Sequence, residues 1–297
     1  MKARRTRERT GTEEAAPGRA QKGRWGRLLL AGAGLVALAS PASAQLLVDD
    51  FTSGAQALCV GDPLDSPGPC DATALEGLES VFHSVDAPAA LGGERDVTLE
   101  RTAVEGTETV RVGINDPINE PGQDVMTTEL LLFDGGVSSE TRTLLVWDGM
   151  EDMLPEEVTA DGLGSAGSPG LDLLAEGQDA FRLRFNSALE IPVRLRVYDA
   201  GDPDGQTWSE TEVILRPTDG LELSTQEVLF ESFVTEGPAG PADFRQIGAI
   251  ELEITGNPGA DLLLDSVQVV PEPGAAPVAA LGALVLLARW RRRMARA

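Results

Sequence analysis

Apolar residues in this chain recur at every second position in short segments, and this alternation is the feature that most restricts how the chain folds. The clearest examples are residues 180–185, Ala-Phe-Arg-Leu-Arg-Phe, and residues 192–198, Pro-Val-Arg-Leu-Arg-Val-Tyr. Successive side chains of a β-strand point to opposite faces, so such a segment buries one row and exposes the other. We expect the two apolar rows to pair. Four arginines then share one basic face on the other side: Arg182, Arg184, Arg194 and Arg196. They either pair with acids on neighbouring strands or form a site for an anionic polysaccharide.

Other segments have the composition of strands and are separated by turn residues. They are residues 46–51, 96–104, 107–114, 129–133, 143–147, 211–216, 227–233, 249–254 and 261–269. Little of the chain has the period of a long amphipathic helix. About ten short strands predict an all-β fold, a β-sandwich of the jelly-roll kind, and the shortage of helices argues against a βαβ enzyme fold.

Residues 1–44 have the three parts of a secretory signal peptide. Nine basic side chains precede an apolar run at residues 28–39, and the run is followed by the small residues Ala42, Ser43 and Ala44. A run of this length is too short to span a bilayer. We therefore expect signal peptidase to cut between Ala44 and Gln45 and the rest of the chain to be exported.

A second apolar run, residues 275–288, is followed by five arginines near the C-terminus. A helix over residues 275–290 would be about 24 Å long at 1.5 Å per residue, and arginine stems with Trp290 would extend it to the headgroups. Because basic flanks stay in the cytoplasm, we expect this transmembrane helix to anchor the chain in the inner membrane, with the preceding residues outside.

The tripeptide Pro271-Glu272-Pro273 stands just before this run. Together with the apolar helix and the arginine-rich end, which contains Arg291, Arg292 and Arg293, it resembles the PEP-CTERM sorting signal of Gram-negative bacteria. Gly274 departs from the Ser or Thr that often follows the motif. The resemblance covers residues 271–297 and implies that the protein is a substrate of exosortase, a membrane transpeptidase that processes the chain near the motif. An ordinary single-span anchor is the alternative.

The part between these signals, residues 45–270, is expected to be one exported domain, and it is strongly acidic. The chain has 24 basic and 48 acidic residues, of which ten and 44 fall in this part, so its net charge is near −34. Such a surface repels nucleic acid and anionic lipid, which excludes a nucleic-acid partner. It indicates divalent-cation binding or a saline surrounding matrix, with the solvated acidic surface of a secreted protein as the alternative.

Cys59 and Cys70 are the only cysteines and bracket a turn-rich segment. In an oxidising compartment we expect them to form a disulfide, which over so short a loop contributes about 3 kcal/mol. Two cysteines and His83, the only histidine, are too few for a zinc site. No G-x-S-x-G motif accompanies His83, so a Ser-His-Asp hydrolase is not indicated either.

The segments near the two ends of the expected domain are similar to the first and last strands of carbohydrate-binding modules with a galactose-binding-like jelly roll. These segments are residues 48–51, 242–252 and 262–267. The resemblance implies contact with exopolysaccharide. It also implies a structural calcium near the first and last strands, for which Asp49 or Asp50 with Asp265 is the candidate.

A second calcium candidate comes from the residues themselves. Asp199, Asp202 and Asp204 lie on a turn between two expected strands, and oxygen donors in a flexible loop suit this ion. The spacing does not fit an EF-hand loop. An ordinary acidic turn is the alternative for both candidates.

Aromatic side chains are needed to stack on sugar rings, and residues 45–270 contain only Trp147, Trp208, Tyr198 and eight phenylalanines. Trp147 stands in an apolar run and is expected in the core. Trp208, beside a polar loop, is the candidate platform for a sugar, with packing at the rim as the alternative. Acids are so numerous that no single pair stands out as a glycosidase pair.

The sequence therefore predicts a non-enzymatic envelope or extracellular-matrix protein, exported and sorted through its tail. Its expected partners are signal peptidase, an exosortase-type transpeptidase, the membrane and exopolysaccharide. The rival hypothesis is a secreted glycan-active enzyme, a hydrolase or lyase that uses a carboxylate pair.

Overall fold

A computed structural model describes residues 45–60, 80–104, 110–114, 130–134, 139–149, 158–163, 170–220 and 222–271 of the 297. All of them belong to the second of two compact units, Ser40–Ala297. Within these ranges the chain forms two antiparallel sheets of seven strands each, with three short 3-10 helices. The predicted all-β sandwich is confirmed.

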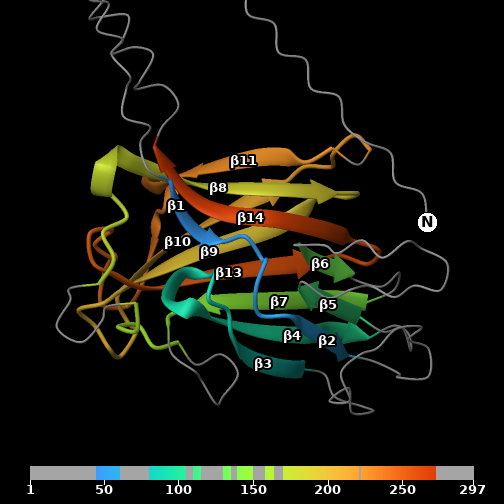
Figure 1. Cartoon of the computed structure of the whole chain (residues 1–297), viewed down its shortest axis with the longest axis horizontal. Helices are drawn as coiled ribbons and strands as arrows, with labels where there is room; N and C mark the ends of the chain where they lie inside the picture. The colour runs from blue at the N-terminus through green and yellow to red at the C-terminus, as the bar shows by residue number, and fades with distance from the viewer. Residues whose placement is uncertain are drawn as a thin grey trace, which may run out of the picture. The chain divides into compact units, whose positions relative to one another are not determined.

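Sheet A has the strand order β11-β8-β14-β6-β5-β2, and β1 pairs with β14 beyond the end of β6 (Figure 1). Its strands are β1 (Leu46–Asp49), β2 (Gln56–Val60), β5 (Val110–Ile114), β6 (Leu131–Asp134), β8 (Gln178–Ser187), β11 (Ser224–Leu229) and β14 (Asp261–Pro271). The long strand β14 lies in the middle of the sheet because β8 pairs along one side of it and β6 and β1 share the other.

Sheet B has the order β12-β10-β9-β13-β7-β4-β3. Its strands are β3 (Ser80–Asp86), β4 (Glu94–Val104), β7 (Ser139–Trp147), β9 (Ile191–Asp199), β10 (Trp208–Leu215), β12 (Thr235–Glu236) and β13 (Ile247–Gly256). The 3-10 helices are η1 (Leu91–Gly93), η2 (Ala175–Gly177) and η3 (Phe230–Ser232).

Alternate side chains from both sheets fill one core. Phe181 and Leu183 of sheet A and Leu195 and Leu252 of sheet B are all buried in the same apolar cluster. Trp147, at the end of β7, is also fully buried there, as its sequence context predicts. Burial of apolar area at about 25 cal/mol per Å² is the main force that holds the two layers together.

The two segments with the clearest alternation do not pair with each other, which corrects the sequence prediction. They became β8 of sheet A and β9 of sheet B, and their apolar rows face the shared core from opposite layers. Two consecutive strands bury the same alternate residues whether they pair in one sheet or pack against each other from two sheets. Alternation alone therefore does not distinguish the two arrangements. The arginines on the other sides of these strands therefore lie on opposite faces of the sandwich.

A buried arginine ties the N-terminal segment to sheet B. Arg95 of β4 is completely buried, and its Nη1 donates to Asp49 Oδ2 at 2.7 Å. Its Nε donates to Gln56 Oε1, and its Nη2 donates to the carbonyl oxygens of Ser53 and Gly54. Trp147 Nε1 donates to the same Asp49 oxygen at 2.9 Å. All three nitrogens of the Arg95 guanidinium are thus hydrogen-bonded, as a buried charge requires.

The two ends of the described domain lie side by side. Leu46 of β1 stands opposite Val269 of β14, so Gln45 and Pro271 are close neighbours at one end of sheet A. No helix among the described residues is long and apolar enough to cross a membrane. The predicted signal peptide, residues 1–44, and nearly all of the sorting tail, including Glu272, Pro273 and Arg291 to Arg293, fall outside the described residues and remain predictions.

Candidate functional site

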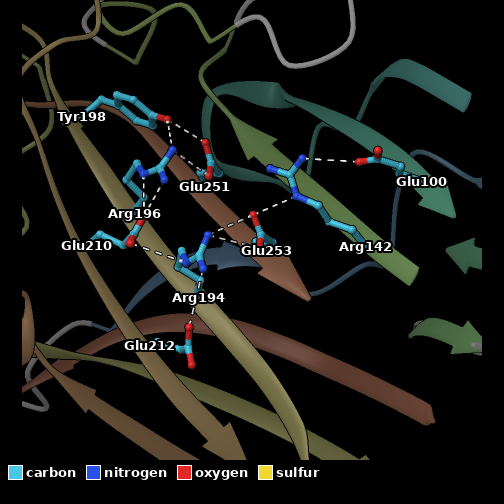
Figure 2. Close-up of polar contacts among 9 residues, drawn as sticks. All are labelled: Glu100, Arg142, Arg194, Arg196, Tyr198, Glu210, Glu212, Glu251 and Glu253. Carbon is cyan, nitrogen blue, oxygen red and sulfur yellow. Dashed lines mark hydrogen bonds and ion pairs between the residues drawn. The ribbon is translucent and has the colours of Figure 1, made fainter. Parts of the chain in front are cut away.

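Charged and aromatic side chains gather on part of the outer face of sheet B, and three strands supply most of them. The register places Arg196 of β9 between Glu210 of β10 and Glu251 of β13, and Arg194 between Glu212 and Glu253. This follows from the alternation of all three strands, because each puts every second residue outward. We call this set, completed by Tyr198, Arg142 and Glu100, the polar ladder (Figure 2).

Arg196 is the best-connected member of the polar ladder. Its Nε donates to Glu210 Oε2 at 2.8 Å, its Nη1 donates to the Tyr198 hydroxyl at 3.0 Å, and its Nη1 lies 3.3 Å from Glu251 Oε1. The Tyr198 hydroxyl in turn donates to Glu251 Oε2 at 2.7 Å. Tyrosine therefore bridges a guanidinium and a carboxylate, and the three side chains hold one another in place (Figure 2).

The other two arginines share Glu253. Arg142 of β7 donates from Nε to Glu253 Oε2 at 2.9 Å, and Arg194 Nη1 lies 3.3 Å from Glu253 Oε1. Arg194 also reaches Glu210 and Glu212 at 3.5 and 3.6 Å, and Arg142 reaches Glu100 of β4 at 3.5 Å. Three cations thus alternate with five carboxylates across five strands of the sheet.

Burial changes the acid-base properties of this network. Burial raises the pKa of the Glu251 carboxyl, an effect that Arg196 and the Tyr198 hydroxyl partly offset. Burial and the nearby Glu251 charge raise the pKa of Tyr198, so its hydroxyl keeps its proton. Burial disfavours the charge on Arg196, but the facing Glu251 and Tyr198 outweigh that effect and raise its pKa.

The accessible part of the polar ladder lies over β9 and β10. Glu251 and Glu253 are buried, and so are Leu144 and Val146, the outward residues of β7 next to them. In contrast, the side chains of Arg194 and Glu212 are 35% and 57% exposed. A ligand would therefore meet the strip that runs along β9 and β10.

Trp208, the predicted sugar platform, lies at one end of this strip. It is half-buried, stands directly opposite Tyr198, and packs with it against Ala249. The Arg196 guanidinium carbon is 4.6 Å from the Trp208 ring centre, so a cation covers one face of the indole. The structure thus shows the rim packing that was the alternative, and it also puts the ring beside the polar ladder.

The expected single basic face does not exist. On sheet A, Arg182 pairs with Glu227 at 2.7 Å and Arg184 pairs with Asp265 at 3.1 Å. Arg194 and Arg196 belong to the polar ladder on the opposite side of the sandwich. All four arginines pair with acids on neighbouring strands, the arrangement that the sequence left open as the alternative to an anionic-polysaccharide site.

The acidic turn after β9 uses its carboxylates to fix its own backbone. Asp199 accepts hydrogen bonds from the backbone amides of Gly201 and Asp243, at 2.7 and 2.9 Å. Asp202 accepts from the Gln206 amide and from the Thr207 hydroxyl, and these bonds lower its pKa. Asp204 follows on the same turn. The predicted ligation of calcium by these residues remains a prediction.

The second calcium candidate is divided among different partners. Asp49 is bound to Arg95 and Trp147, and Asp50 accepts hydrogen bonds from the amide and hydroxyl of Thr52. Asp265 faces Arg184 on sheet A. Among the residues that the structure describes, no three His, Cys, Asp or Glu side chains are grouped as a metal would require.

Cys59 of the predicted disulfide and the single histidine, His83, lie on different strands. Cys59 is buried in β2, whereas Cys70 lies outside the described ranges, so their pairing remains a prediction. His83 lies on strand β3, where its side chain is exposed. Strand β3 is at one edge of sheet B, and the strands β13, β7 and β4 separate it from β9 and β10 of the polar ladder.

Sequence reasoning identified Trp208 but missed Tyr198 and the two buried glutamates. The alternation pattern pointed to these residues in part. Tyr198 ends the alternation of residues 192–198, and Glu251 and Glu253 alternate with apolar residues in segment 249–254. What was missing was the order of strands, which brings β13 against β9 over 50 residues away in the chain.

No protein-family model matches this chain, and none of the curated proteins does. Among solved structures, the family 11 carbohydrate-binding module of Clostridium thermocellum aligns at 12% identity over 77% of this chain and 96% of its own, with a TM-score of 0.31. The module TmCBM61, solved with β-1,4-galactotriose, aligns at 16% identity over 55% of this chain and 82% of its own, with a TM-score of 0.28. The fold described here rests on the strand pairings above, and the finer resemblance to galactose-binding-like jelly rolls remains a prediction.

Proposed function

We propose that this chain is an exported, non-enzymatic envelope or matrix protein whose β-sandwich binds polysaccharide through the polar ladder. The observation that carries the proposal is the fixed set of planar polar groups beside Trp208. Arg194, Arg196, Glu210 and Glu212 offer donors and acceptors in pairs at positions set by the strand spacing. Recognition groups that are already held in place lose little entropy when a ligand binds.

A sugar chain matches this surface in two respects. Each hydroxyl of a sugar can both donate and accept hydrogen bonds. In the strip, the guanidinium groups donate and the neighbouring carboxylates accept, so each hydroxyl finds a partner of either kind. The apolar face of a sugar ring needs an apolar partner, and the strip offers Trp208 at one end and the exposed Ile214 near the other. Because the arginines are already paired with acids, the strip favours an uncharged polysaccharide over an anionic one.

Export and sorting complete the proposal and are supported by the sequence of the two ends. The side-by-side position of Gln45 and Pro271 is compatible with a domain whose leader and tail both meet one membrane. In this proposal signal peptidase and an exosortase-type enzyme process the chain, and the apolar helix holds it at the inner membrane before processing.

A glycan array incubated with the full chain, solubilised in detergent, tests the binding function. We expect uncharged polysaccharides on the array to retain the chain. Trp208→Ala should weaken this retention about tenfold, since stacking on a ring contributes on the order of 1 to 3 kcal/mol. Gln268→Ala, on the outer face of sheet A, is the matched control and should bind as the parent does. Equal binding by both variants would exclude the polar ladder as the site.

The rival function, a glycan-active enzyme, has one observation in its favour. Burial raises the pKa of Glu251, as expected of a general acid in glycoside hydrolysis. Incubating the bound glycans with the chain and with Glu251→Gln separates the two functions. The proposal expects no new reducing ends from either protein, whereas release by the parent and not by Glu251→Gln would establish the enzyme.

A further inference from the structure

The outer face of sheet A carries a depression that is separate from the polar ladder. Its volume is about 330 Å³, and it lies where β6, β14 and β8 run side by side (Figure 1). Its lining is half polar and half apolar: Leu132, Asp134, Asn186, Ala188, Asp261 and Leu263. The volume falls within the range of small-ligand sites, and it is enough for one or two sugar rings.

The strand register arranges this lining in two rows. Leu132 of β6 stands directly opposite Leu263 of β14, and Asp134 stands directly opposite Asp261. Asn186 of β8 stands opposite Leu263 from the other side. The depression therefore has an apolar floor bordered by a pair of carboxylates and by an amide.

The orientation of Asn186 is fixed by its surroundings. Its Nδ2 donates to the carbonyl oxygens of Gly220 and Glu222, both at 2.9 Å. Both N–H groups of the amide are thus used, and its Oδ1 is left as an acceptor. None of the six lining side chains then offers a donor to the depression, because the others are carboxylates or apolar groups.

Among the described residues, Asp261 faces the like charge of Asp134 and forms no ion pair. Like charges directly opposite on neighbouring strands destabilise a sheet. Burial and the Asp134 charge together raise the pKa of Asp261. Arg111 of β5 stands across from Asp134 on the side away from Asp261, so Asp261 is the carboxylate farther from that cation. A ligand that fits must bring hydrogen-bond donors and positive charge to Asp261, and apolar area to the leucines.

We propose that this depression binds a sugar with a free amino group, such as a glucosamine unit of a partly deacetylated polysaccharide. The ammonium group lies against Asp261 and Asp134, a hydroxyl donates to Asn186 Oδ1, and the C–H face of the ring packs on Leu132 and Leu263. This inference adds a second glycan site to the proposed function and makes the domain bivalent, since sheet A and the polar ladder of sheet B face opposite ways. Such a domain would link polysaccharide chains.

Calorimetric titration with three tetrasaccharides tests the inference: β-1,4-linked glucosamine, its fully N-acetylated form, and uncharged β-1,4-linked glucose. At about pH 6 an amine of ordinary pKa is charged. We expect the detergent-solubilised full chain to bind the glucosamine oligomer most tightly. Asp261→Asn should weaken this binding at least tenfold, as expected for the loss of a charge-assisted hydrogen bond, and high salt should weaken it further.

Glu231→Gln is the matched control, because it removes the same charge from an exposed site on η3. It should leave the titration unchanged. Equal affinities for the three oligomers, or an unaltered affinity in Asp261→Asn, would overturn the inference. Trp208→Ala separates it from the proposed function: it should weaken binding of uncharged glycans at the polar ladder and leave glucosamine binding intact. Loss of glucosamine binding in Trp208→Ala with Asp261→Asn unaffected would place the amino sugar at the polar ladder and refute the second site.

Discussion

Asp49 shows how one residue can decide whether the sandwich closes. It is fully buried, it accepts from Arg95 and Trp147 through Oδ2, and it accepts from the Phe51 amide through Oδ1 at 2.7 Å. Phe51 itself has a φ of 57°, a conformation that non-glycine residues seldom adopt. A carboxylate that the sequence offered as a calcium ligand thus serves to hold the first strand against sheet B.

Asp49→Asn should therefore destabilise the protein strongly. The variant leaves the buried Arg95 without its counter-charge, and breaking a buried pair in this way costs about 3 to 5 kcal/mol. Chemical denaturation followed by fluorescence measures the change. Glu227→Gln, which breaks the half-exposed pair with Arg182, is the control and should cost at most about 1 kcal/mol. Similar losses in the two variants would contradict the role given to Asp49.

Glu251 gives the polar ladder a pH dependence with a definite sign. Its pKa in the folded protein lies above the ordinary value of a glutamate, so the folded state holds this proton more tightly than the unfolded state does. The resulting contribution to stability is present at low pH and is lost as the pH rises from the ordinary glutamate pKa through the folded one.

We therefore predict that the stability of the parent relative to Glu251→Gln falls as the pH rises through that window. Melting temperatures of the two proteins, measured side by side from about pH 4 upward, give the difference and cancel the effect of the other acids. A difference that stays constant, or one that grows with pH, would show that burial of Glu251 does not control its ionisation.

The turn that follows β12, residues 237–240, positions the sugar platform. Gly237 lies against Trp208 so closely that an added Cβ would be 2.7 Å from the indole Cδ1 and would also meet the carbonyl oxygen of Gln206. The backbone amide of Gly237 donates to the Trp208 carbonyl at 2.9 Å. The absence of a side chain at this position is therefore what lets the ring lie over Arg196.

Gly237→Ala should displace the Trp208 ring and weaken glycan binding about as much as Trp208→Ala does. Near-ultraviolet circular dichroism reports the ring, and retention on the glycan array reports the binding. Ala239→Ser, at an exposed position of the same turn, should change neither. An unmoved indole signal in Gly237→Ala would mean that the turn adapts and does not hold the ring.

The elements themselves were largely predictable, whereas their pairing was not. Alternation located the strands that have a full inward row, such as residues 180–185 and 192–198, now within β8 and β9. It missed the five-residue β2 and the two-residue β12, and it missed β3, whose position at the sheet edge leaves both of its rows partly exposed. Pairing depends on contacts between segments far apart in the chain, such as β13 with β9, and no local pattern encodes these.

The same limit applies to the candidate site. Trp208 was predicted because an aromatic residue beside a polar loop is unusual in so aromatic-poor a chain. Glu251 could not be linked to it, because only the order of strands in sheet B brings this residue to Arg196 and Tyr198. Likewise, the alternation of segments 180–185 and 192–198 gave the right outward residues but the wrong common face.

On the scale of the whole molecule, the chain enters and leaves the sandwich at one place. Leu46 opposite Val269 makes the first and last strands neighbours, and β14 pairs as far as Pro271, the first residue of the predicted sorting motif. The predicted tail thus follows the folded domain with almost no spacer, and the predicted cleavage site precedes β1 by a single residue, Gln45.

Mass spectrometry of envelope fractions should accordingly find a mature N-terminus at Gln45. Cleavage there leaves all of β1 in the folded domain, whereas cleavage a few residues later would remove the strand that positions Asp49. A variant with Ala42 and Ala44 both changed to Leu should keep its leader, because the small residues that signal peptidase needs are gone. Exported parent protein that still begins at Met1 would contradict the assignment.

In the proposed function, the polar ladder of sheet B binds polysaccharide at its accessible strip. Its most direct test is an amide and side-chain NMR titration of the full chain with an oligomer of a polysaccharide retained on the array. We predict that the largest shifts occur at the Trp208 indole N–H and at the Nε–H groups of Arg194 and Arg196. The proposed function would be contradicted if these three groups did not shift. It would also be contradicted if an uncharged oligomer shifted only protein signals of sheet A.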